Sequence, residues 1–574
     1  RMAAFPLLVG TTHPRPLPDR SGRGDWGGAP SPTFGHLPND PPTDRGLTSL
    51  PNTRSMMTQR SRLPEVEVPD SHLTPVVMRK ADSLAAQAAM IDGPTGRIVT
   101  YAELVDGVMR MAGGLAARGF GHGDVLAIMA PNIPEYAVIF HGVAAVGGIN
   151  TTINPTYTAE EVEHQLVDSG ARYLVTTSAF LGTASSAAAA AEVEEIFVID
   201  EAPGTSSLAD LLAGEPVTGY AAVDSGEDVV VLPYSSGTTG LPKGVMLTHR
   251  NLVANLVQGE AALGVEQGEV AVAVLPFFHI YGMQVLMNAV LYAGATSVTM
   301  PRFDLEEFLR IIQDHSVTKA YLVPPIVLAL AKHPLVDNYD LSSLKSVFSG
   351  AAPLSAELAL AASERVGCEV VQGYGLTETS PVTHATPEGE FKPGSIGLAL
   401  PNTECRVVDP VSGEDLGVDE DGEIWIRGPQ VMKGYLNEPE ASAAAIDEDG
   451  WLRTGDIGHF DSEGHWYIVD RLKELIKYKG FQVAPAELEG LLLTHPAVAD
   501  AAVIPVADEE AGEVPKGFVV LKADSQATPQ ELMDFVAEHV AHYKKIRVLE
   551  IIDEIPKSAS GKILRRVLKD REAG

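Results

Sequence analysis

The chain has 574 residues, of which 45% are hydrophobic and 21% are charged, a balance typical of globular proteins. Its formal net charge of −34 disfavours binding to nucleic acids or anionic membranes, because both are negatively charged themselves. The two cysteines, Cys368 and Cys405, exclude a framework of several disulfides and favour a reducing compartment, so we expect a cytoplasmic protein. No apolar stretch approaches the roughly 20 residues of a membrane span, which predicts no stable membrane insertion.

The first 55 residues differ from the rest of the chain in composition. They contain ten prolines and seven glycines, and their apolar residues follow neither a helical nor a strand-like period. A segment of this composition cannot bury enough apolar surface to offset the entropy lost on ordering. We therefore expect residues 1–55 to form a disordered extension.

From about residue 65 onwards, short apolar runs alternate with longer amphipathic runs. Residues 124–131 (DVLAIMAP) predict a buried strand, residues 134–148 a helix, and residues 171–177 (ARYLVTT) another strand. The alternation continues through further predicted strands at residues 269–278, 296–300, 319–325 and 344–350. This pattern is typical of parallel strands joined by helices, so we expect the α/β class, with mostly parallel sheets flanked by helices.

The pattern changes after residue 400, where short strands separated by Gly/Asp turns predict a small β-subdomain. These strands are expected at residues 403–409, 422–428 and 465–471. From about residue 473 the chain predicts an α+β module, with helices at residues 484–495 and 529–543 and strands at residues 499–506, 517–522 and 548–553. We place a boundary near residues 471–473, between an N-terminal domain (65–471) and a smaller, mobile C-terminal domain (473–574).

One motif, YSSGTTGLPKG at residues 234–244, has the residue types that bind phosphate. Its glycines permit close approach of backbone N–H groups, its hydroxyls add donors, and Lys243 adds a positive charge. The motif follows an apolar strand at residues 229–234, and we expect a helix after it over residues 245–259. The pattern GxxxxGK[ST] of ATPases does not occur, and a mobile surface turn is the alternative. The candidate phosphate ligands are Ser235, Ser236, Gly237, Thr238, Thr239, Gly240 and Lys243.

A second motif, QGYGLTETSP at residues 372–381, combines an aromatic ring with a hydroxyl and a carboxylate. Tyr374 is suited to stacking on a flat ring and Thr377 to donating to a phosphate. Glu378 is suited to Mg²⁺, which usually binds one or two carboxylates together with substrate phosphates. The alternative is a helix cap, because Thr with a nearby Glu often begins a helix.

Asp456 is a third candidate, in a TGD sequence that we expect to form a tight turn. There its carboxylate is suited to accept both hydroxyls of a ribose, and the alternative is that it serves only its own turn. A basic cluster follows near the predicted domain boundary, where the alternative is a solvated helix face. This cluster comprises Arg471, Lys473, Lys477 and Lys479.

Two further candidates are Lys562 and His279. Lys562 follows a Ser-Gly turn in PKSASGKILRR and precedes a short predicted helix, and the alternative is a solvated basic tail. His279 stands with Tyr281 at the end of a predicted strand, where ligands bind in open α/β sheets. The alternative for His279 is a histidine packed in the core.

Together these motifs resemble those of the adenylate-forming acyl-CoA synthetase superfamily (AMP-binding enzymes), and within it they are most similar to the 4-coumarate:CoA ligases. YSSGTTGLPKGVMLTHRN resembles the first signature of that group, and GEIWIRGPQVMKGYLNEPE resembles the second, with Trp425 where the plant enzymes carry cysteine. The likeness covers about residues 65 to 570, and residues 1–55 have no counterpart in it.

The resemblance implies a two-step ligase reaction. ATP and a carboxylic acid would form an acyl-adenylate and pyrophosphate, and CoA would then take the acyl group as a thioester. Lys562 would be the adenylation lysine, Thr377 would bind the α-phosphate and Glu378 would hold Mg²⁺. Lys473 would be the hinge about which the C-terminal domain turns. The other implied nucleotide or CoA contacts are Gly350, Ala351, Gln372, Gly373, Tyr374 and Gly375 near adenine, Asp456 and Arg471 at the ribose, and Lys477, Lys479 and Gln482.

The resemblance also implies the acyl pocket, lined by His279, Tyr281, Val285, Lys345, Phe348, Ala351, Gly373, Gly375 and Val382. Its small residues leave room for a flat ring, so we expect a cinnamate-type arylpropenoic acid as substrate. Val285 replaces a hydroxyl residue of some plant enzymes, which leaves benzoate-like and medium-chain fatty acids open. The alternatives are an adenylating enzyme that loads a carrier protein and a luciferase-like oxygenase. We expect a monomer or homodimer whose partners are the acid, ATP and CoA, and no nucleic acid.

Overall fold

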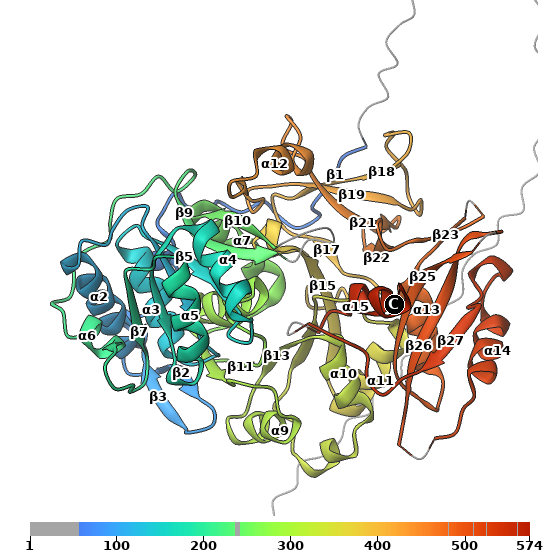
Figure 1. Ribbon diagram of the computed structural model, residues 1–574, viewed down its shortest axis with the longest axis horizontal. Helices are drawn as coiled ribbons and strands as arrows, with labels where there is room; N and C mark the ends of the chain where they lie inside the picture. Colours follow the sequence, from blue (N-terminus) through green and yellow to red (C-terminus); the bar gives the residue numbers. More distant parts are fainter. Residues whose placement is uncertain are drawn as a thin grey trace, which may run out of the picture. The chain divides into compact units, whose positions relative to one another are not determined.

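The computed structural model describes residues 57–235, 242–479, 481–508, 510–523, 525–558 and 561–573. The predicted disordered extension and the loop residues 236–240 lie outside these ranges, so both remain predictions. Within the described ranges the chain forms sheets that are covered by helices (Figure 1).

The N-terminal sheet has the strand order β20–β10–β9–β5–β4–β6–β7–β8. From β9 to β8 neighbouring strands run parallel, whereas β10 pairs antiparallel with both β9 and β20. Its strands are β4 (Val125–Met129), β5 (Ile149–Thr152), β6 (Ala171–Thr176), β7 (Glu195–Val198), β8 (Ser206–Ser207), β9 (Val229–Ser235), β10 (Lys243–Thr248) and β20 (Gly434–Tyr435). The strands predicted at residues 124–131 and 171–177 are confirmed as β4 and β6.

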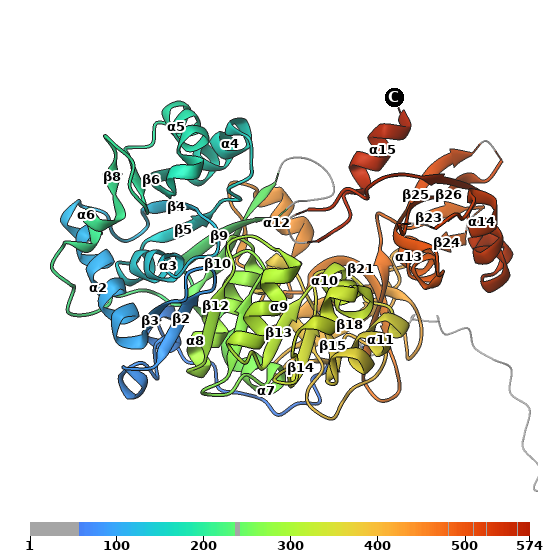
Figure 2. The ribbon, with the colours of Figure 1, turned by 90° about the horizontal axis from the view of Figure 1, so that it is seen from below.

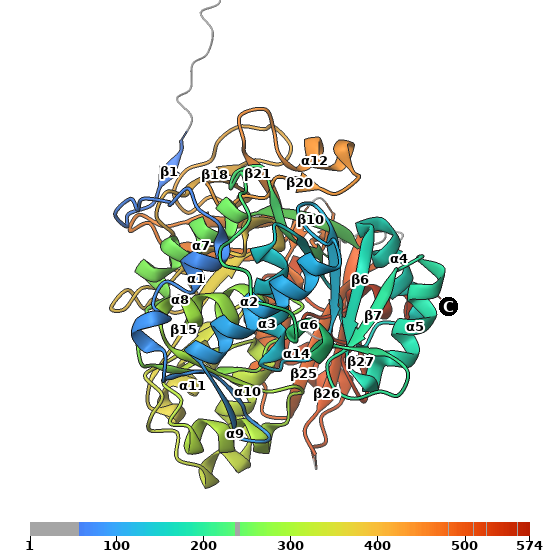
Figure 3. The ribbon, with the colours of Figure 1, turned by 90° about the vertical axis from the view of Figure 1, so that its left-hand side faces the viewer.

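Helices cover both faces of this N-terminal sheet (Figure 3). Val125, Ala127 and Met129 of β4 pack into a cluster with α4 and α5. Leu126 and Ile128 point to the opposite face, where they join the core that contains α2 and α3. Because both faces are buried, β4 reads as a continuous apolar run instead of an alternating one. The helices are α2 (Tyr101–Ala117), α3 (Glu135–Ala145), α4 (Ala159–Ser169), α5 (Leu181–Ala190) and α6 (Leu208–Leu212).

The central sheet has the strand order β17–β16–β15–β14–β13–β11–β12–β2–β3. The strands from β15 to β2 run parallel, so the carboxyl ends of β13, β14 and β15 meet at one edge of the sheet. Its strands are β2 (Ala88–Asp92), β3 (Arg97–Thr100), β11 (Val270–Ala273), β12 (Thr296–Thr299), β13 (Lys319–Leu322), β14 (Ser346–Ser349), β15 (Glu369–Gly375), β16 (Val382–Ala385) and β17 (Leu398–Ala399). The strands predicted between residues 269 and 350 are confirmed as β11, β12, β13 and β14.

Helices that follow these strands cover the central sheet, as the α/β pattern predicts. They are α1 (Leu73–Val77), α7 (His249–Leu263), α8 (Val290–Ala293), α9 (Leu305–Asp314), α10 (Pro324–Lys332) and α11 (Ala356–Val366). A π-helix, η3 (Tyr281–Ala289), precedes α8. Such π-helical turns are rare and often occur at functional sites.

The small β-subdomain is an antiparallel sheet with the order β1–β18–β19–β21–β22, as predicted for the region after residue 400. Its strands are β1 (Gln59–Arg60), β18 (Glu404–Val408), β19 (Gly422–Arg427), β21 (Leu452–Phe460) and β22 (Trp466–Arg471), and α12 (Pro439–Ala445) lies between β20 and β21. β21 and β22 carry Asp456 and Arg471, which belong to the predicted nucleotide site.

The C-terminal module, residues 476–573, has a sheet of order β24–β23–β26–β25, and β27 runs parallel to β26. Figure 2 shows α13 and α14 beside this sheet. Its elements are β23 (Ile476–Tyr478), β24 (Phe481–Val483), α13 (Pro485–Thr494), β25 (Val498–Asp508), β26 (Gly512–Leu521), α14 (Pro529–His539), β27 (Val548–Ile551) and α15 (Arg565–Ala573). Leu488, Val503, Val519 and Leu532 belong to a hydrophobic core of its own. The predicted α/β class, with a larger N-terminal and a smaller C-terminal part, is confirmed, while the boundary near residue 472 stays a prediction.

One local prediction is wrong. The helix expected over residues 245–259 begins only at His249, because residues 243–248 form β10, which pairs antiparallel with β9. Thr248 caps α7 through a capping box with Asn251, which fixes the start of the helix at that point. The Gly-rich motif therefore joins two antiparallel strands, and its described ends, Ser235 and Lys243, lie opposite each other in the ladder.

In the described part of the chain, no helix combines the length and the apolar character that crossing a membrane requires.

Candidate active site

A cavity lies beyond the carboxyl ends of β14 and β15, at the edge where the parallel strands of the central sheet end. Its free volume is about 40 Å³, which is room for only a few water molecules. The residues that line it are His279, Ile280, Tyr281, Phe348, Gly350, Ala351, Gly373, Tyr374, Gly375, Leu376, Thr377, Pro381, Val382 and Lys562. All are predicted site residues except Ile280, Leu376 and Pro381, which directly adjoin predicted positions and carry no chemical signal of their own.

Glycines allow aromatic rings to pack directly against the backbone in the wall of this cavity. A Cβ atom at Gly373 would lie 2.1 Å from the ring carbon Cζ of Phe348, and one at Gly350 would lie 3.2 Å from the ring of Tyr281. Ala351 follows with a φ of 70°, in the left-handed region that residues with a Cβ atom rarely adopt. The wall is therefore flat and has no space for a larger side chain at Gly373.

His279 and Tyr281 form an uncharged part of the wall. Burial lowers the pKa of His279 to about 3, and the positive charge of Lys562 acts in the same direction. The imidazole is therefore neutral near pH 7 and offers one donor and one acceptor. The Tyr281 hydroxyl lies 3.4 Å from the carbonyl oxygen of Phe348, and burial raises its pKa, so it stays protonated.

Lys562 is placed in the cavity by a tight turn before α15. The Ser558 N–H donates to the Lys562 carbonyl at 2.8 Å, and the Lys562 N–H donates to the Ser558 hydroxyl oxygen at 3.1 Å. Burial lowers the pKa of Lys562 and the charge of Arg471 adds to this, whereas the carboxylates of Glu378 and Asp456 oppose it. The ammonium group thus lies in the same site as the predicted phosphate and ribose ligands.

Asp456 lies in β21 and not in a tight turn, which corrects the interpretation of the TGD sequence. It pairs with Arg471 in the β21–β22 ladder. In this strand its carboxylate contacts neighbouring side chains and not the backbone of a turn. Arg471 Nε lies 3.2 Å from Asp456 Oδ1, and the Tyr374 hydroxyl donates to Oδ2 at 2.5 Å. Burial raises the pKa of Asp456, and the Arg471 charge opposes this shift. The predicted adenine and ribose residues are thereby joined in one hydrogen-bonded group.

Thr377 and Glu378 lie on a short 3-10 turn, η5 (Thr377–Thr379), that follows β15. The Tyr435 hydroxyl donates to Glu378 Oε1 at 2.9 Å, and Lys243 Nζ lies 5.3 Å from the centroid of the same tyrosine ring. Tyr435 is therefore a site residue that the sequence motifs did not single out, although it lies within the second signature. It connects the Gly-rich motif to the Glu378 carboxylate.

Two residues predicted for the acyl pocket are not among the described residues that line the cavity. Lys345 precedes β14, at the opposite end of that strand from the cavity, and its Nζ pairs with Glu269 Oε1 at 2.9 Å. Its prediction is wrong, because the side chain points to the amino-terminal edge of the sheet. Val285, one turn after Tyr281 on η3, is 1% exposed and packs in the hydrophobic core. Gln372 also lies outside the lining, where its Oε1 accepts the Leu354 N–H at 3.0 Å.

The structure does not bring the predicted CoA-side residues to the cavity. None of four described residues lines the cavity, and all four are exposed: the predicted hinge residue Lys473 and the predicted CoA-side residues Lys477, Lys479 and Gln482. Lys479 pairs with Glu510 at the surface. Lys562 and these residues belong to the same C-terminal part of the chain, yet only Lys562 faces the cavity.

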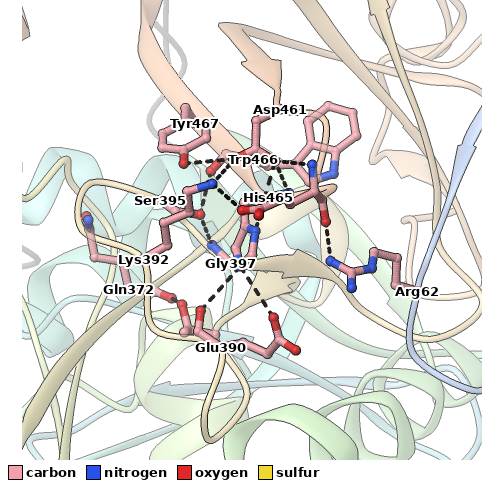
Figure 4. Close-up of polar contacts among 12 residues, drawn as sticks. Arg62, Gln372, Glu390, Lys392, Ser395, Gly397, Asp461, His465, Trp466 and Tyr467 are labelled. Atoms are coloured by element: carbon pink, nitrogen blue, oxygen red, sulfur yellow. Dashed lines mark hydrogen bonds and ion pairs between the residues drawn. The ribbon is translucent and has the colours of Figure 1, made fainter. Parts of the chain in front are cut away.

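A separate group of ligating side chains lies in the turn between β21 and β22 (Figure 4). The ligand atoms of Asp461, Glu463 and His465 lie within 4.8 Å of one another. The Lys392 ammonium already contacts both carboxylates, at 2.6 Å from Asp461 Oδ2 and 2.7 Å from Glu463 Oε2. Hydrogen bonds and Lys392 hold the pKa of Asp461 at about 2, below its usual value in spite of desolvation, which acts the other way. The lysine supplies the positive charge that a metal ion would otherwise bring.

Comparison with known proteins gives matches to two family models and to named relatives. Residues 77–436 match the family model described as AMP-binding enzyme, and residues 487–562 match the AMP-binding enzyme C-terminal domain. The chain is 44% identical over 526 residues to 4-coumarate–CoA ligase 1 of Solanum tuberosum, covering 90% of this chain and 96% of that protein. It is 45% identical over 525 residues to 4-coumarate–CoA ligase 3 of Oryza sativa subsp. japonica, covering 90% and 95%.

Among solved structures, the anthranilate CoA ligase AuaEII in complex with anthranoyl-AMP has a TM-score of 0.82 at 28% identity, covering 88% of this chain and 98% of that one. The first family model alone spans well over half of the chain, and the plant relatives extend the likeness into the C-terminal module. The chain therefore belongs to the AMP-binding enzyme family, in which it groups with the acid–thiol ligases.

Proposed function

We propose that the chain joins a cinnamate-type arylpropenoic acid to CoA, with ATP and Mg²⁺, through an acyl-adenylate. The observation that carries the proposal is that Lys562, Thr377 and Tyr374 line one cavity, where the Tyr374 hydroxyl donates to Asp456, the partner of Arg471. A lysine held there is suited to an anionic reaction centre, because its amino group is positioned before the reaction begins.

In the first step the acid's carboxylate attacks the α-phosphorus of ATP, an acyl–phosphate bond forms and pyrophosphate leaves. Both reactants are anions, so positive charge and hydrogen-bond donors are needed to offset their repulsion. Lys562 supplies the charge, and the Thr377 hydroxyl supplies a donor. Asp456 and Arg471 hold the ribose side of the nucleotide. The narrow cavity limits the water that would hydrolyse the mixed anhydride.

The residues present fit a magnesium ion. Glu378 offers a carboxylate oriented by the Tyr435 hydroxyl, and Mg²⁺ typically takes one or two carboxylates plus phosphate oxygens. When bound, the ion neutralises negative charge on the phosphates.

In the second step the CoA thiol attacks the acyl carbon, a thioester forms and AMP leaves.

The shape and polarity of the cavity support a flat, apolar acyl group. Phe348, Tyr281 and Val382 line it, and the rings of Phe348 and Tyr281 pack directly against the backbone of Gly373 and Gly350. The plant relatives are named 4-coumarate–CoA ligases, which fits an aryl group joined to a short unsaturated chain. Cys368 and Cys405 are both free, which supports the proposed cytoplasmic location. The oligomeric state, monomer or homodimer, stays a prediction.

A panel of acids tests the substrate. Pyrophosphate release in the presence of ATP, Mg²⁺ and CoA should be fastest with cinnamate or 4-coumarate, slower with benzoate and slowest with octanoate. The reason is that a rigid aryl group loses less conformational entropy on entering a narrow apolar cavity than a flexible chain does. A preference for octanoate would contradict the aryl assignment while leaving the ligase chemistry intact.

Lys473→Pro tests the predicted hinge. Proline fixes φ of residue 473 and restricts Leu472 before it, so rotation of the backbone at this point is hindered. No hydrogen bond is given up among the described turn contacts, since the donors there are Leu472, Glu474 and Leu475. ATP–pyrophosphate exchange should persist, and conversion of supplied acyl-adenylate to thioester should fall at least about tenfold. Equal rates of thioester formation in both proteins would refute the hinge.

A further inference from the structure

One surface of the C-terminal module faces the cavity, and a different surface faces solvent. Lys562 lies in the cavity, whereas Lys477 and Lys479 are exposed on the β23–β24 hairpin. The proposed two-step function, on which this inference rests, uses both surfaces at one cavity. The module must therefore turn between steps, and some contact has to hold it in the orientation described here until the adenylate has formed.

Asp470 makes such a contact. It lies in β22 just before the predicted hinge and is 4% exposed. Its Oδ1 accepts the Arg471 N–H at 2.6 Å, and its Oδ2 accepts the N–H of Ala486 at 2.9 Å. Ala486 is the second residue of α13, where backbone N–H groups have no partner within the helix. A carboxylate on one side of the hinge thus caps a helix on the other side.

Positive charge near the cap of α13 comes from the same segment of the chain that carries Lys562. Arg565, three residues later, donates from Nη2 to both carboxylate oxygens of Glu489 at 2.8 Å and also pairs with Glu474. Burial raises the pKa of Asp470, and the Arg565 charge is the largest effect that opposes it. Asp470 therefore contacts the amino terminus of α13 directly, and the Arg565 charge favours the ionised form of its carboxyl.

We propose that Asp470 is a positioning residue for adenylation: by capping α13 across the hinge, it holds the C-terminal module in the orientation that inserts Lys562 into the cavity. Turning of the module about residue 473 separates Asp470 from Ala486, so this contact exists in one orientation only. Another contact between the two parts, from Lys332 Nζ to the Leu493 carbonyl at 3.1 Å, is exposed and therefore weaker.

Ala486→Pro removes the donor of this hydrogen bond and leaves Asp470 and Arg471 unchanged. The substitution suits the helix, because Pro485 already occupies its first position and α10 begins with Pro324 and Pro325 in the same two positions. Loss of a buried hydrogen bond to a charged group should slow ATP–pyrophosphate exchange about tenfold or more. Conversion of supplied acyl-adenylate to thioester should not fall. Asp470→Asn, which weakens the same bond from the other side, should give the same split.

Gln530→Pro is the matched control, because it places proline at the second position of α14, in the same module and away from the hinge. It should change neither half-reaction. Trypsin should cleave residues 471–479, which contain four basic residues, faster in Ala486→Pro than in Gln530→Pro. Equal loss of both half-reactions in Ala486→Pro and Asp470→Asn, or unchanged exchange in both, would overturn the proposal. Absence of exchange in the unaltered chain with every acid would instead overturn the proposed function.

Discussion

Lys562→Ala is expected to lower ATP–pyrophosphate exchange by about 10²–10³-fold, the loss typical of removing one preorganised electrostatic group from a transition state. The ammonium group lies in the cavity with Arg471, Glu378 and Asp456 around it. Among the described residues of the C-terminal module, no other one lines the cavity, so the substitution removes the module's positive charge from it. Conversion of supplied acyl-adenylate to thioester should be largely retained, because that step forms no new bond to phosphorus.

Lys557→Ala is the control for this experiment. Lys557 lies five residues earlier on the same turn, and its Nζ pairs with Asp500 Oδ2 at 2.6 Å outside the cavity. Its loss removes a positive charge of the same kind and a partly exposed ion pair, which contributes little to stability. Exchange should change less than about threefold. If Lys562→Ala retained exchange as well as Lys557→Ala does, the role of Lys562 in adenylation would be refuted.

Stability should fall steeply as the pH drops below 6.5, because several histidines are buried in neutral form. His141, His249 and His384 are each at most 1% exposed, and burial lowers the pKa of each to about 3. The unfolded chain binds protons at these groups below pH 6.5, whereas the folded chain does not. Their contribution is therefore present above pH 6.5 and is lost as the pH falls towards 3. Each group should cost about 1.4 kcal/mol per pH unit in that window.

His249→Asn isolates one of these contributions. The His249 Nδ1 accepts the Leu73 N–H at 3.1 Å, and the Asn side-chain oxygen occupies nearly the same place without titrating. The free energy of unfolding, measured by urea titration at pH 7.5, 6.5 and 5.5, should fall less steeply in the variant, by about 1 kcal/mol between the last two values. The exposed His542→Asn should follow the unaltered chain. Parallel curves for His249→Asn and the unaltered chain would contradict the explanation.

Asp470 and Glu489 have the opposite effect on stability from the buried histidines, so they reduce the total loss of stability as the pH falls. Burial raises the pKa of both, that of Glu489 to about 7. A carboxyl whose pKa is raised in the folded state binds its proton before the unfolded chain does, so it adds stability as the pH falls. The comparison between variants, and not the total slope, is therefore the measurement that isolates His249.

The α/β class and the alternation of strands and helices along the chain could be predicted because most strands are short, apolar and followed by a helix. The wrong helix at residues 245–259 shows where this fails. Val245 and Leu247 alternate over too few residues to be distinguished from the start of the apolar face of α7. What separates strand from helix is the pairing of β10 with β9, a contact that local periodicity does not contain.

Residues that line the cavity could be predicted where a motif fixes the backbone around them, as at Tyr374, Thr377 and Lys562. Lys345 was predicted wrongly because a matching position in sequence does not say towards which edge of a sheet a side chain points. Tyr435 was missed because its contact with Glu378 spans 57 residues and joins β20 to η5. The Asp470–Ala486 contact could not be predicted for the same reason, since each residue alone has an ordinary local role.

Ala351 has a consequence for altering which acids the enzyme accepts. Enlarging a cavity by truncating a wall residue usually weakens packing, so gains in substrate range come with losses in folding stability. At Ala351 a larger cavity and a more stable fold go together. Its left-handed φ of 70° is unfavourable for alanine by about 1–2 kcal/mol, whereas the same φ has no steric cost for glycine. A glycine there would add the volume of a methyl group beside the cavity and relieve the backbone at once. Directed evolution towards bulkier acids has, at this position, a first step that stability does not oppose.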